Sequence, residues 1–276
     1  STHSFDWLTA MMIRDKLLEV QDSLAAARES LLNLSAKHVN TIYPAYKANR
    51  ESAPEELKRQ FAHCKAVCAS LGLATLGHAD YEADDLIGSA LHLARGHGFR
   101  GVIVSADKDL SQLLDEHDEQ FDFAKGLRWG RNGVKARHGV EAHQIADYLA
   151  LAGDAIDNIP GVSGIGAKTA AVLLAHFGSL DAILARVDEI PFLRIRGAAQ
   201  MAVRLRAQRE DALLYRQLST IALSAPLAGA DALFARAAAD RQGMDALCER
   251  LRFGPLTRRR LYQAAGLEVA LSSAAS

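Results

Sequence analysis

The segment Gly101-Val-Ile-Val-Ser-Ala-Asp-Lys-Asp-Leu110 begins with a short, wholly apolar run and ends in two aspartates. Such a run is typical of a strand that is buried on both faces in a parallel sheet. Apolar periodicity and capping residues predict helices over about 15–34, 54–71 and 82–96, and a short extended piece is expected near 38–42. The alternation of strands with helices predicts an α/β fold over residues 1–145.

The sequence changes character after residue 142, where a helix, a glycine-rich turn and a long helical tail follow without a convincing strand. We therefore expect two domains, 1–145 and 146–276. A content of 49% hydrophobic and 24% charged residues excludes extended disorder and a fibrous chain. No apolar run approaches the roughly 20 residues that span a bilayer. Because the first residues also lack the pattern of a secretory signal, the expected compartment is the cytoplasm.

The formal net charge is −1, which by itself argues against binding to a polyanion. The basic residues are nevertheless concentrated in the ranges 47–50, 128–137, 194–209 and 258–260. An acidic, metal-binding site within a partly basic surface would give the same near-neutral total. Cys64 and Cys68 have no second Cys or His pair at zinc-finger spacing, so buried, reduced thiols are expected.

Three groups of carboxylates stand at the ends of predicted elements. They are Glu82 and Asp85 at a helix start, Asp107 and Asp109 after the strand, and Asp154 and Asp157 before the glycine-rich turn. Taken singly, each group is more often a helix cap or a turn. On one rim of an α/β sheet they would repel one another unless cations lay between them. Oxygen ligands favour Mg²⁺ or Mn²⁺ over zinc, and two such ions can activate water against a phosphodiester.

The glycine-rich turn is Ile159-Pro-Gly-Val-Ser-Gly-Ile-Gly-Ala-Lys-Thr169. It is not a nucleotide-binding loop, because Ala167 separates Gly166 from Lys168 and no buried strand precedes the turn. A helix-hairpin-helix unit fits better, since its glycines let backbone N–H groups point at a phosphate of DNA. A plain tight connection between two helices is the other interpretation of this segment.

Four ordered motifs together resemble the bacterial 5′-3′ exonuclease and flap endonuclease family, which includes the N-terminal nuclease domain of DNA polymerase I. The motifs are Tyr43-Pro-Ala-Tyr-Lys-Ala-Asn-Arg50, Glu82-Ala-Asp-Asp-Leu-Ile-Gly88, Val104-Ser-Ala-Asp-Lys-Asp-Leu110 and Gly153-Asp-Ala-Ile-Asp-Asn-Ile-Pro-Gly-Val-Ser-Gly-Ile-Gly-Ala-Lys-Thr169. The resemblance covers about residues 37–265. It implies a PIN-like α/β nuclease domain with a central, mostly parallel sheet, a helical arch over about 43–71, and a smaller all-helical helix-three-turn-helix domain.

The resemblance also implies a two-metal nuclease that hydrolyses DNA at 5′ ends, nicks or flaps, with Mg²⁺ or Mn²⁺ as cofactor. A first ion would be held by Glu82, Asp84, Asp85 and Asp107, and a second by Asp109, Asp154 and Asp157. Lys47 and Arg50 match residues that contact the scissile phosphate. DNA-binding residues would be Tyr46, Lys47, Arg50, Gly161, Gly164, Gly166, Lys168 and Thr169, with a potassium ion at the turn. A monomer that works beside a replication or repair polymerase is expected.

The N-terminal region of the chain departs from the family pattern. Family members have an early strand that ends in Asp-Gly and a second Asp at the end of the next strand. Here Asp6 is the only candidate for the first position, and no carboxylate lies between Glu29 and Glu51. The leading hypothesis is thus an active nuclease, the alternative is a DNA-binding homologue with weakened or lost catalysis, and a domain without a nucleic-acid role is a third.

Overall fold

The computed structural model describes residues 42–50, 53–229 and 233–267. The predicted helix over 15–34, most of the extended piece near 38–42, and Asp6 lie outside this part of the chain. The described residues form two compact units. One comprises 42–50 and 78–226, and the other comprises 53–77 with the described residues from 227 onward. The domain boundary expected near residue 145 remains a prediction.

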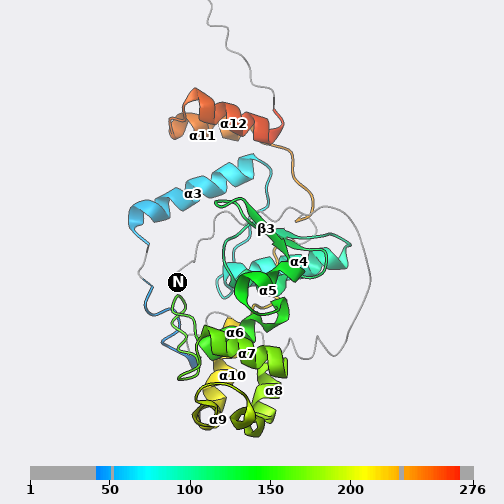
Figure 1. Cartoon of the computed structure of the whole chain (residues 1–276). Helices are drawn as coiled ribbons and strands as arrows, with labels where there is room; N and C mark the ends of the chain where they lie inside the picture. Colours follow the sequence, from blue (N-terminus) through cyan, green and yellow to red (C-terminus); the bar gives the residue numbers. More distant parts are fainter. Residues whose placement is uncertain (1–41, 51–52, 230–232, 268–276) are drawn as a thin grey trace, which may run out of the picture. The chain divides into compact units, whose positions relative to one another are not determined.

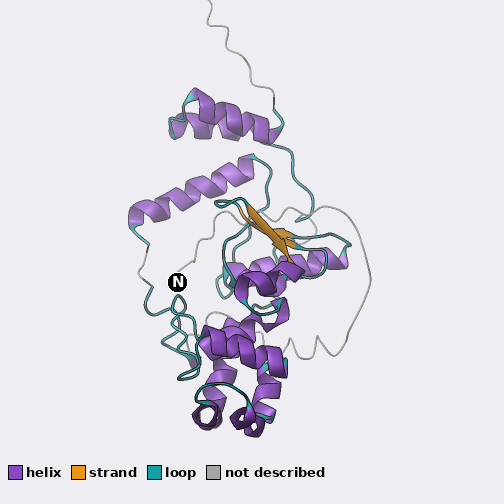
Figure 2. Ribbon diagram, viewed as in Figure 1, coloured by secondary structure: helices purple, strands orange, loops and turns teal. Residues whose placement is uncertain are grey.

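The first unit contains a small mixed sheet and most of the helices (Figures 1 and 2). Its elements are α4 (Ala83–Gly96), β1 (Val102–Ile103), η1 (Asp109–Leu113), β2 (Glu119–Asp122), β3 (Leu127–Gly130), α5 (Arg131–His138), η2 (Ala142–Gln144), α6 (Ile145–Ala152), α7 (Ala167–Phe177), α8 (Leu180–Ala185), η3 (Val187–Phe192), α9 (Ala198–Ala207) and α10 (Arg209–Ser219). The helix predicted over 82–96 and the strand within 101–105 are therefore confirmed.

The sheet has the order β1-β2-β3, with β1 parallel to β2 and β2 antiparallel to β3. The expected parallel pairing thus accounts for one of the two described ladders, and the β2–β3 hairpin makes the sheet mixed. Ile103 on β1 is fully buried, as the apolar run predicts. Gln120 on β2 is also fully buried. Its side-chain amide donates to the backbone oxygens of Ser105 and Asp107, so the sheet fixes the turn that carries the aspartates.

Helix α4 packs closely against the segment that follows α10. Its buried face includes Leu86, Leu91 and Ala94. A Cβ added at Gly88 would lie 2.8 Å from a side-chain carbon of Ile221 and 3.1 Å from the Ala222 oxygen. The glycine therefore permits the close approach that brings the start of α4 against this segment. Helices α6 to α10 gather beyond the sheet (Figure 1), and their contacts bury Leu149, Leu173 and Leu205.

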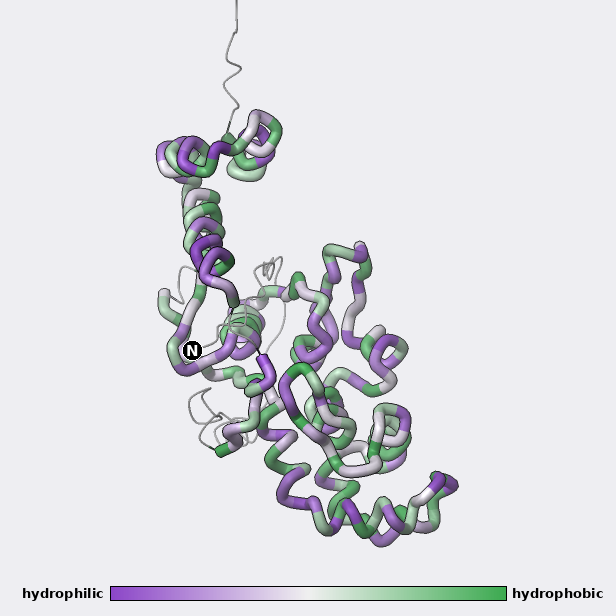
Figure 3. Tube along the Cα trace, turned by 90° about the vertical axis from the view of Figure 1, so that its left-hand side faces the viewer, coloured by the Kyte–Doolittle hydropathy of each residue, from purple (hydrophilic) through white to green (hydrophobic). Residues whose placement is uncertain are grey.

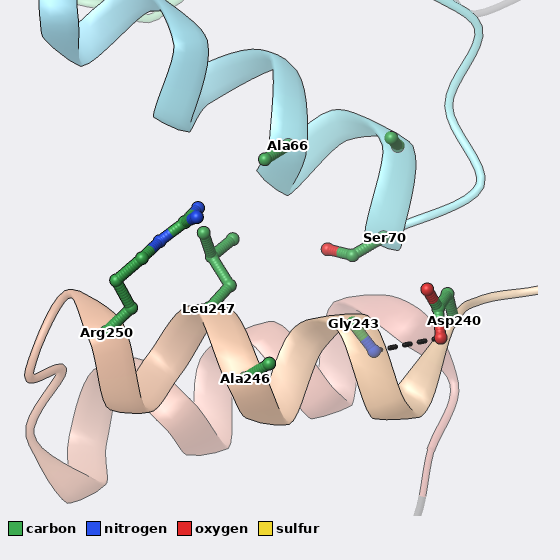
Figure 4. A pocket seen from close by; sticks show the side chains of 8 residues that line it. Ala66, Ser70, Asp240, Gly243, Ala246, Leu247 and Arg250 are labelled. Atoms are coloured by element: carbon green, nitrogen blue, oxygen red, sulfur yellow. Dashed lines mark hydrogen bonds between the residues drawn. The ribbon is translucent and has the colours of Figure 1, made fainter.

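The second unit consists of α3 (Glu55–Ser70), α11 (Arg241–Arg250) and α12 (Pro255–Ala265), so the helix predicted over 54–71 is confirmed. Met244, Cys248 and Tyr262 form its small core. Backbone hydrogen bonds from Ala237 N to Gly72 O and from Asp240 N to Ser70 O join α3 to α11. An open pocket of about 380 Å³ lies between these two helices (Figure 4). Apolar and small residues make up most of its lining.

Hydrophobic and hydrophilic residues are interleaved along the helices in both units (Figure 3). None of the described helices has the combination of length and apolar character that crossing a membrane requires. The cysteines are unpaired, with Cys248 buried, Cys68 partly buried and Cys64 exposed. The expectation of a buried thiol was therefore wrong for Cys64, which lies on the solvent side of the amphipathic helix α3.

Candidate functional site

The three predicted carboxylate groups meet within the first unit. Glu82 is the N-cap of α4, Asp109 begins η1 directly after the turn that follows β1, and Asp154 lies in the loop before the glycine-rich turn. Asp84 is electrostatically coupled to Asp107, Glu82 and Asp109, and Asp109 in turn to Asp107, Asp154 and Asp157. Residues that lie up to 75 positions apart in the chain thus share one acidic cluster.

Asp85 holds the first turn of α4 in place. One of its oxygens accepts a hydrogen bond from the Glu82 backbone N–H at 3.0 Å, as in a capping box, and the other accepts from the Ala222 N–H at 2.9 Å. Burial raises the pKa of Asp85 to about 6 in spite of these two bonds. The cap interpretation therefore describes what Asp85 does here, and its position leaves Glu82 and Asp84 projecting from the same helix start.

The turn after β1 presents Asp107 and Asp109. Asp107 accepts a hydrogen bond from the Asp109 backbone N–H at 3.0 Å, and its own N–H donates to the Ser105 hydroxyl at 3.1 Å. One carboxylate oxygen of Asp109 is buried and has no hydrogen-bond partner among the described residues. Burial, followed by the nearby Asp107, raises the pKa of Asp109 to about 7. This oxygen is therefore buried without the hydrogen bond that such atoms normally have.

The loop that carries Asp154 and Asp157 is closed by two glycines. The N–H and C=O groups of Asp154 pair with those of Ile159, both at 2.8 Å. Gly153 and Gly161 have φ values of +82° and +72°, and a Cβ on Gly161 would lie 2.4 Å from the Gly153 nitrogen. Backbone crosses backbone at this point, so both positions require glycine. Gly161, predicted to contact DNA, therefore also closes this loop.

The segment 43–50 docks on the same loop and brings basic side chains to the cluster. The Lys47 backbone N–H donates to the Asp157 backbone oxygen at 2.9 Å, and the Asn158 side-chain amide donates to the Ala45 backbone oxygen at 2.6 Å. Lys47 pairs with Glu82 and lies 3.6 Å from Asp157, with which Arg50 also forms a salt bridge. Lys47 and Arg50 thus lie beside the carboxylates, and their expected contact with a scissile phosphate remains a prediction.

Two further groups complete this side of the cluster. The Tyr46 hydroxyl lies 3.3 Å from Asp157, and burial together with the charges of Glu82 and Asp157 raises the pKa of Tyr46. Lys108 forms a salt bridge of 2.8 Å with Asp154. Lys108 stands between two predicted ligands in the sequence, yet no role was assigned to it, because its partner is 46 residues away.

The other carboxylates have no such partners. Asp84, Asp107 and Asp109 form no salt bridge within the described part of the chain. Burial, followed by the negative charge of Asp107, raises the pKa of Asp84 well above its ordinary value. Among the residues that the structure describes, no three His, Cys, Asp or Glu side chains are arranged around one point as metal ligands. The basic side chains already engage Glu82, Asp154 and Asp157.

The chemistry of these residues nevertheless fits a hard divalent cation. The donors are all carboxylate oxygens, which Mg²⁺ and Mn²⁺ prefer. One oxygen of Asp109 has no hydrogen-bond partner among the described residues, and burial raises the pKa values of Asp84 and Asp109, so a bound cation would favour their ionised forms. Asp84, Asp107 and Asp109 are thus the residues best placed to accept a cation.

The glycine-rich turn lies between the acidic loop and α7. Gly164 has a φ of +79°, and Gly166 is the N-cap of α7. Lys168 is exposed and Thr169 partly exposed in the first turn of that helix. A helix N-terminus with exposed N–H groups and a nearby lysine attracts an anion. The arrangement agrees with a helix-hairpin-helix unit rather than with a nucleotide-binding loop.

Helix α9 supports this turn through residues that sequence reasoning missed. Gln208 accepts a hydrogen bond from the Ser163 N–H at 2.8 Å, and Arg204 donates to the Ser163 oxygen at 3.4 Å. An ideal Cβ on Gly164 would lie 1.8 Å from a terminal nitrogen of Arg204, so this guanidinium occupies the space that a side chain at 164 would take. The sequence shows basic residues concentrated over 194–209, but this pattern alone did not identify Arg204.

Two family models match consecutive parts of the chain. The model of the 5′-3′ exonuclease N-terminal resolvase-like domain matches residues 9–139. The model of the 5′-3′ exonuclease C-terminal SAM fold matches residues 140–242. The two matches therefore follow one another along most of the chain.

Relatives of known name agree with these matches. The thermostable DNA polymerase I of Thermus aquaticus is 38% identical over 221 residues, which cover 78% of this chain and 24% of the relative. The 5′-3′ exonuclease of Buchnera aphidicola subsp. Schizaphis graminum is 35% identical over 188 residues, which cover 68% of this chain and 66% of that protein. The chain thus spans about a quarter of the polymerase and just under two thirds of the exonuclease.

Solved structures share the fold at lower identity. The bacteriophage T5 5′-exonuclease with bound zinc has a TM-score of 0.55 and 23% identity, covering 82% of this chain and 78% of its own. A bacteriophage T5 flap endonuclease complex with DNA and metal ions has a TM-score of 0.55 and 21% identity, covering 83% and 79%. These likenesses confirm the predicted combination of a PIN-like, resolvase-like domain with a helical C-terminal domain.

Proposed function

The chain belongs to the 5′-3′ exonuclease family, and from this premise we propose that it is a divalent-metal-dependent nuclease that hydrolyses DNA at 5′ ends or 5′ flaps. The observation that carries the proposal is the acidic cluster in which Asp84, Asp107 and Asp109 form no salt bridge among the described residues and Asp109 keeps a buried oxygen without a hydrogen bond. A site that only stabilised the fold would gain nothing from leaving these carboxylates without ion pairs.

The metal ligands we propose are those expected from the motifs. Glu82, Asp84, Asp85 and Asp107 would hold one ion, directly or through water, and Asp109, Asp154 and Asp157 would hold a second. Two bound Mg²⁺ or Mn²⁺ ions would supply an activated water and neutralise charge on the phosphate. Because Asp85 is already engaged by two backbone N–H groups, we assign it a supporting part in positioning Glu82 and Asp84.

Lys47 and Arg50 would bind the phosphate that is cleaved. Both side chains already lie at the edge of the acidic cluster, where Asp157 holds them. A substrate phosphate would replace carboxylate oxygens as their partner, an exchange between similar anions. Tyr46, whose raised pKa keeps its hydroxyl protonated at neutral pH, would remain a hydrogen-bond donor beside them.

The glycine-rich turn would bind the DNA backbone away from the cleavage point. The proposed contacts are Gly161, Gly164, Gly166, Lys168 and Thr169, and a potassium ion would bind at the same turn. Such contacts position a duplex without reading its bases. We also propose that the protein acts as a monomer at the bacterial nucleoid, beside a replication or repair polymerase.

The second candidate is a DNA-binding homologue with weakened or lost catalysis. The observation in its favour is the absence of any carboxylate between Glu29 and Glu51, where the family pattern places an aspartate. This candidate retains the turn and the basic residues near 47–50, and it predicts salt-sensitive binding to branched DNA without cleavage.

Cleavage of a 5′-flap substrate by purified protein separates the two candidates. The nuclease proposal predicts products in the presence of Mg²⁺ or Mn²⁺, none with a chelator, and none from Asp107→Asn. Intact flap DNA with either ion, together with retained binding, would support the inactive homologue and refute the nuclease.

A further inference from the structure

The end of η3 and the short connection to α9 expose an aromatic ring and two arginines. Phe192 is 87% exposed, the largest value among the exposed large hydrophobic residues that the structure describes. Arg194 and Arg196 are exposed as well. Leu193 and Ile195, which alternate with them, pack against the hydrophobic core of the first unit. The connection thus turns its aliphatic side chains inward and leaves its aromatic and cationic side chains in solvent.

Local hydrogen bonds fix this connection. The Leu193 N–H donates to the Ile190 oxygen at 2.9 Å, and the Ile195 N–H donates to the Leu193 oxygen at 2.8 Å. Gly197, with a φ of +74°, leads directly into α9. Because both ends and both inward side chains are anchored, Phe192 is held outside rather than left there by a loose loop.

The charge of this surface is not neutralised by its neighbours. Neither Arg194 nor Arg196 takes part in an ion pair in the described part of the chain. The nearest carboxylates along the sequence are already engaged, Asp188 by Arg206 and Glu189 by Arg186. An exposed ring, followed in the chain by two exposed arginines without ion pairs among the described residues, therefore presents both a stacking face and positive charge.

We propose that Phe192, Arg194 and Arg196 form a contact surface for unpaired nucleotides of a nucleic acid. A base can stack on an aromatic ring irrespective of its identity, and arginines beside the ring bind the phosphates. A hydrophobic protein partner would be served by the ring alone and would gain nothing from two unpaired cations. The surface therefore offers a single strand both positive charge and an aromatic face for stacking.

Helix α9 connects this surface to the glycine-rich turn. It begins at Ala198, next to the exposed connection, and near its other end Arg204 contacts Ser163. Ten helical residues span about 15 Å, which is a few nucleotides along a strand. The inference rests on the proposed function, in which the glycine-rich turn binds duplex DNA. Phe192, Arg194 and Arg196 would then bind unpaired nucleotides next to that duplex.

The test compares two fluorescent DNA probes with the full chain in EDTA, so that no cleavage occurs. One probe is a blunt duplex, and the other is the same duplex with an unpaired oligothymidylate tail. Wild-type protein should bind the tailed probe more tightly. Phe192→Ala should weaken tailed binding by roughly tenfold and leave blunt binding unchanged. Val203→Ala, which removes an exposed apolar side chain from α9, is the matched control and should change neither.

Salt dependence supplies an independent readout. Arg194→Gln and Arg196→Gln should each reduce the slope of log affinity against log salt by about 0.7 on the tailed probe. The proposal is overturned if Phe192→Ala leaves the preference for the tail intact, or if it weakens both probes equally. A wild-type protein that prefers the tail but leaves a 5′ flap uncut in Mg²⁺ would refute the nuclease proposal alone.

Discussion

The acidic cluster contains two kinds of carboxylate that differ in what neutralises them. The paired carboxylates are Glu82, Asp154 and Asp157, which form salt bridges with Lys47, Lys108 and Arg50. The unpaired carboxylates are Asp84, Asp107 and Asp109, which form none among the described residues. Both kinds occupy the same unit and face the same surroundings, so the difference lies in their partners and not in their location.

This difference indicates that the two kinds of carboxylate have different roles, one in the fold and the other in metal binding. The paired carboxylates tie segments that are distant in sequence into one site, and they can do so without any ion. Burial makes the ionised forms of Asp84 and Asp109 unfavourable, and a bound cation would favour these forms. We therefore expect changes in the unpaired carboxylates to affect metal binding and catalysis, and changes around the paired carboxylates to affect the fold.

The largest effect is expected for Asp84→Asn. Removing a charge from the unpaired carboxylates should lower the rate of 5′-flap cleavage in Mg²⁺ by about 100-fold or more, because a metal ligand is lost. Urea unfolding in EDTA should show no loss of stability, since the buried charge was unfavourable. Asp188→Asn, an exposed aspartate paired with Arg206, is the control and should keep its activity. Full activity of Asp84→Asn would contradict the assignment.

Gly161→Ala should damage the loop of the paired carboxylates. The new Cβ would meet the Gly153 nitrogen at 2.4 Å with φ at +72°, so we expect a loss of about 2–5 kcal/mol in the free energy of unfolding. Gly164→Ala is the matched control, because its Cβ meets only the mobile end of Arg204, and it should lose about 1 kcal/mol. Equal losses in the two variants would argue against a backbone crossing at 161.

The pH dependence of metal-free stability should report on Asp109. Its pKa of about 7 in the folded state lies above the unfolded value of about 4, so its stabilising contribution is complete below about pH 4 and is lost as the pH rises through 7. Asp109→Asn should therefore gain stability relative to wild type on going from pH 4 to pH 8, by roughly 1–4 kcal/mol. Denaturation curves in EDTA at both pH values provide the test. If the free energy of unfolding changed equally with pH in wild-type protein and in Asp109→Asn, the raised pKa of Asp109 would be refuted.

The smallest effect on stability is expected for Arg50→Gln, which should destabilise the protein, whereas Asp109→Asn should stabilise it at high pH. Losing this salt bridge to Asp157 should lower the free energy of unfolding by about 1 kcal/mol, because Tyr46 and Lys47 still face the carboxylate. The exposed pair of Arg131 and Asp115 offers a control, since Arg131→Gln should change stability by only a few tenths of a kcal/mol. A stabilised Arg50→Gln would remove the distinction between the two kinds of carboxylate.

The parts of the fold that were predicted have strong local signals. The apolar run before Asp107 identified β1, and capping residues identified α3 and α4. The β2–β3 hairpin was missed because its strands carry charged residues, with Arg128 lying over the ring of Phe121 and pairing with Glu119 across the strands. Cross-strand pairing of this kind stabilises a hairpin without the alternation of apolar residues on which sequence-based prediction relies.

The site was predictable in its acidic residues and less so in their partners. The carboxylates stand at element ends, which a sequence reveals, and the family motifs gave Lys47 and Arg50. Physical reasoning on the sequence alone could not pair Arg50 with Asp157, because 107 residues separate them. The same holds for Arg204 and Ser163, which are 41 residues apart and meet only when α9 packs on the turn.

Calorimetric titration of the metal-free protein with Mn²⁺ tests most directly whether the unpaired carboxylates hold divalent ions. Wild-type protein should bind Mn²⁺, Asp84→Asn should lose most of that affinity, and Asp188→Asn should bind as wild type does. Absence of binding to wild-type protein, or equal binding by all three proteins, would contradict the account.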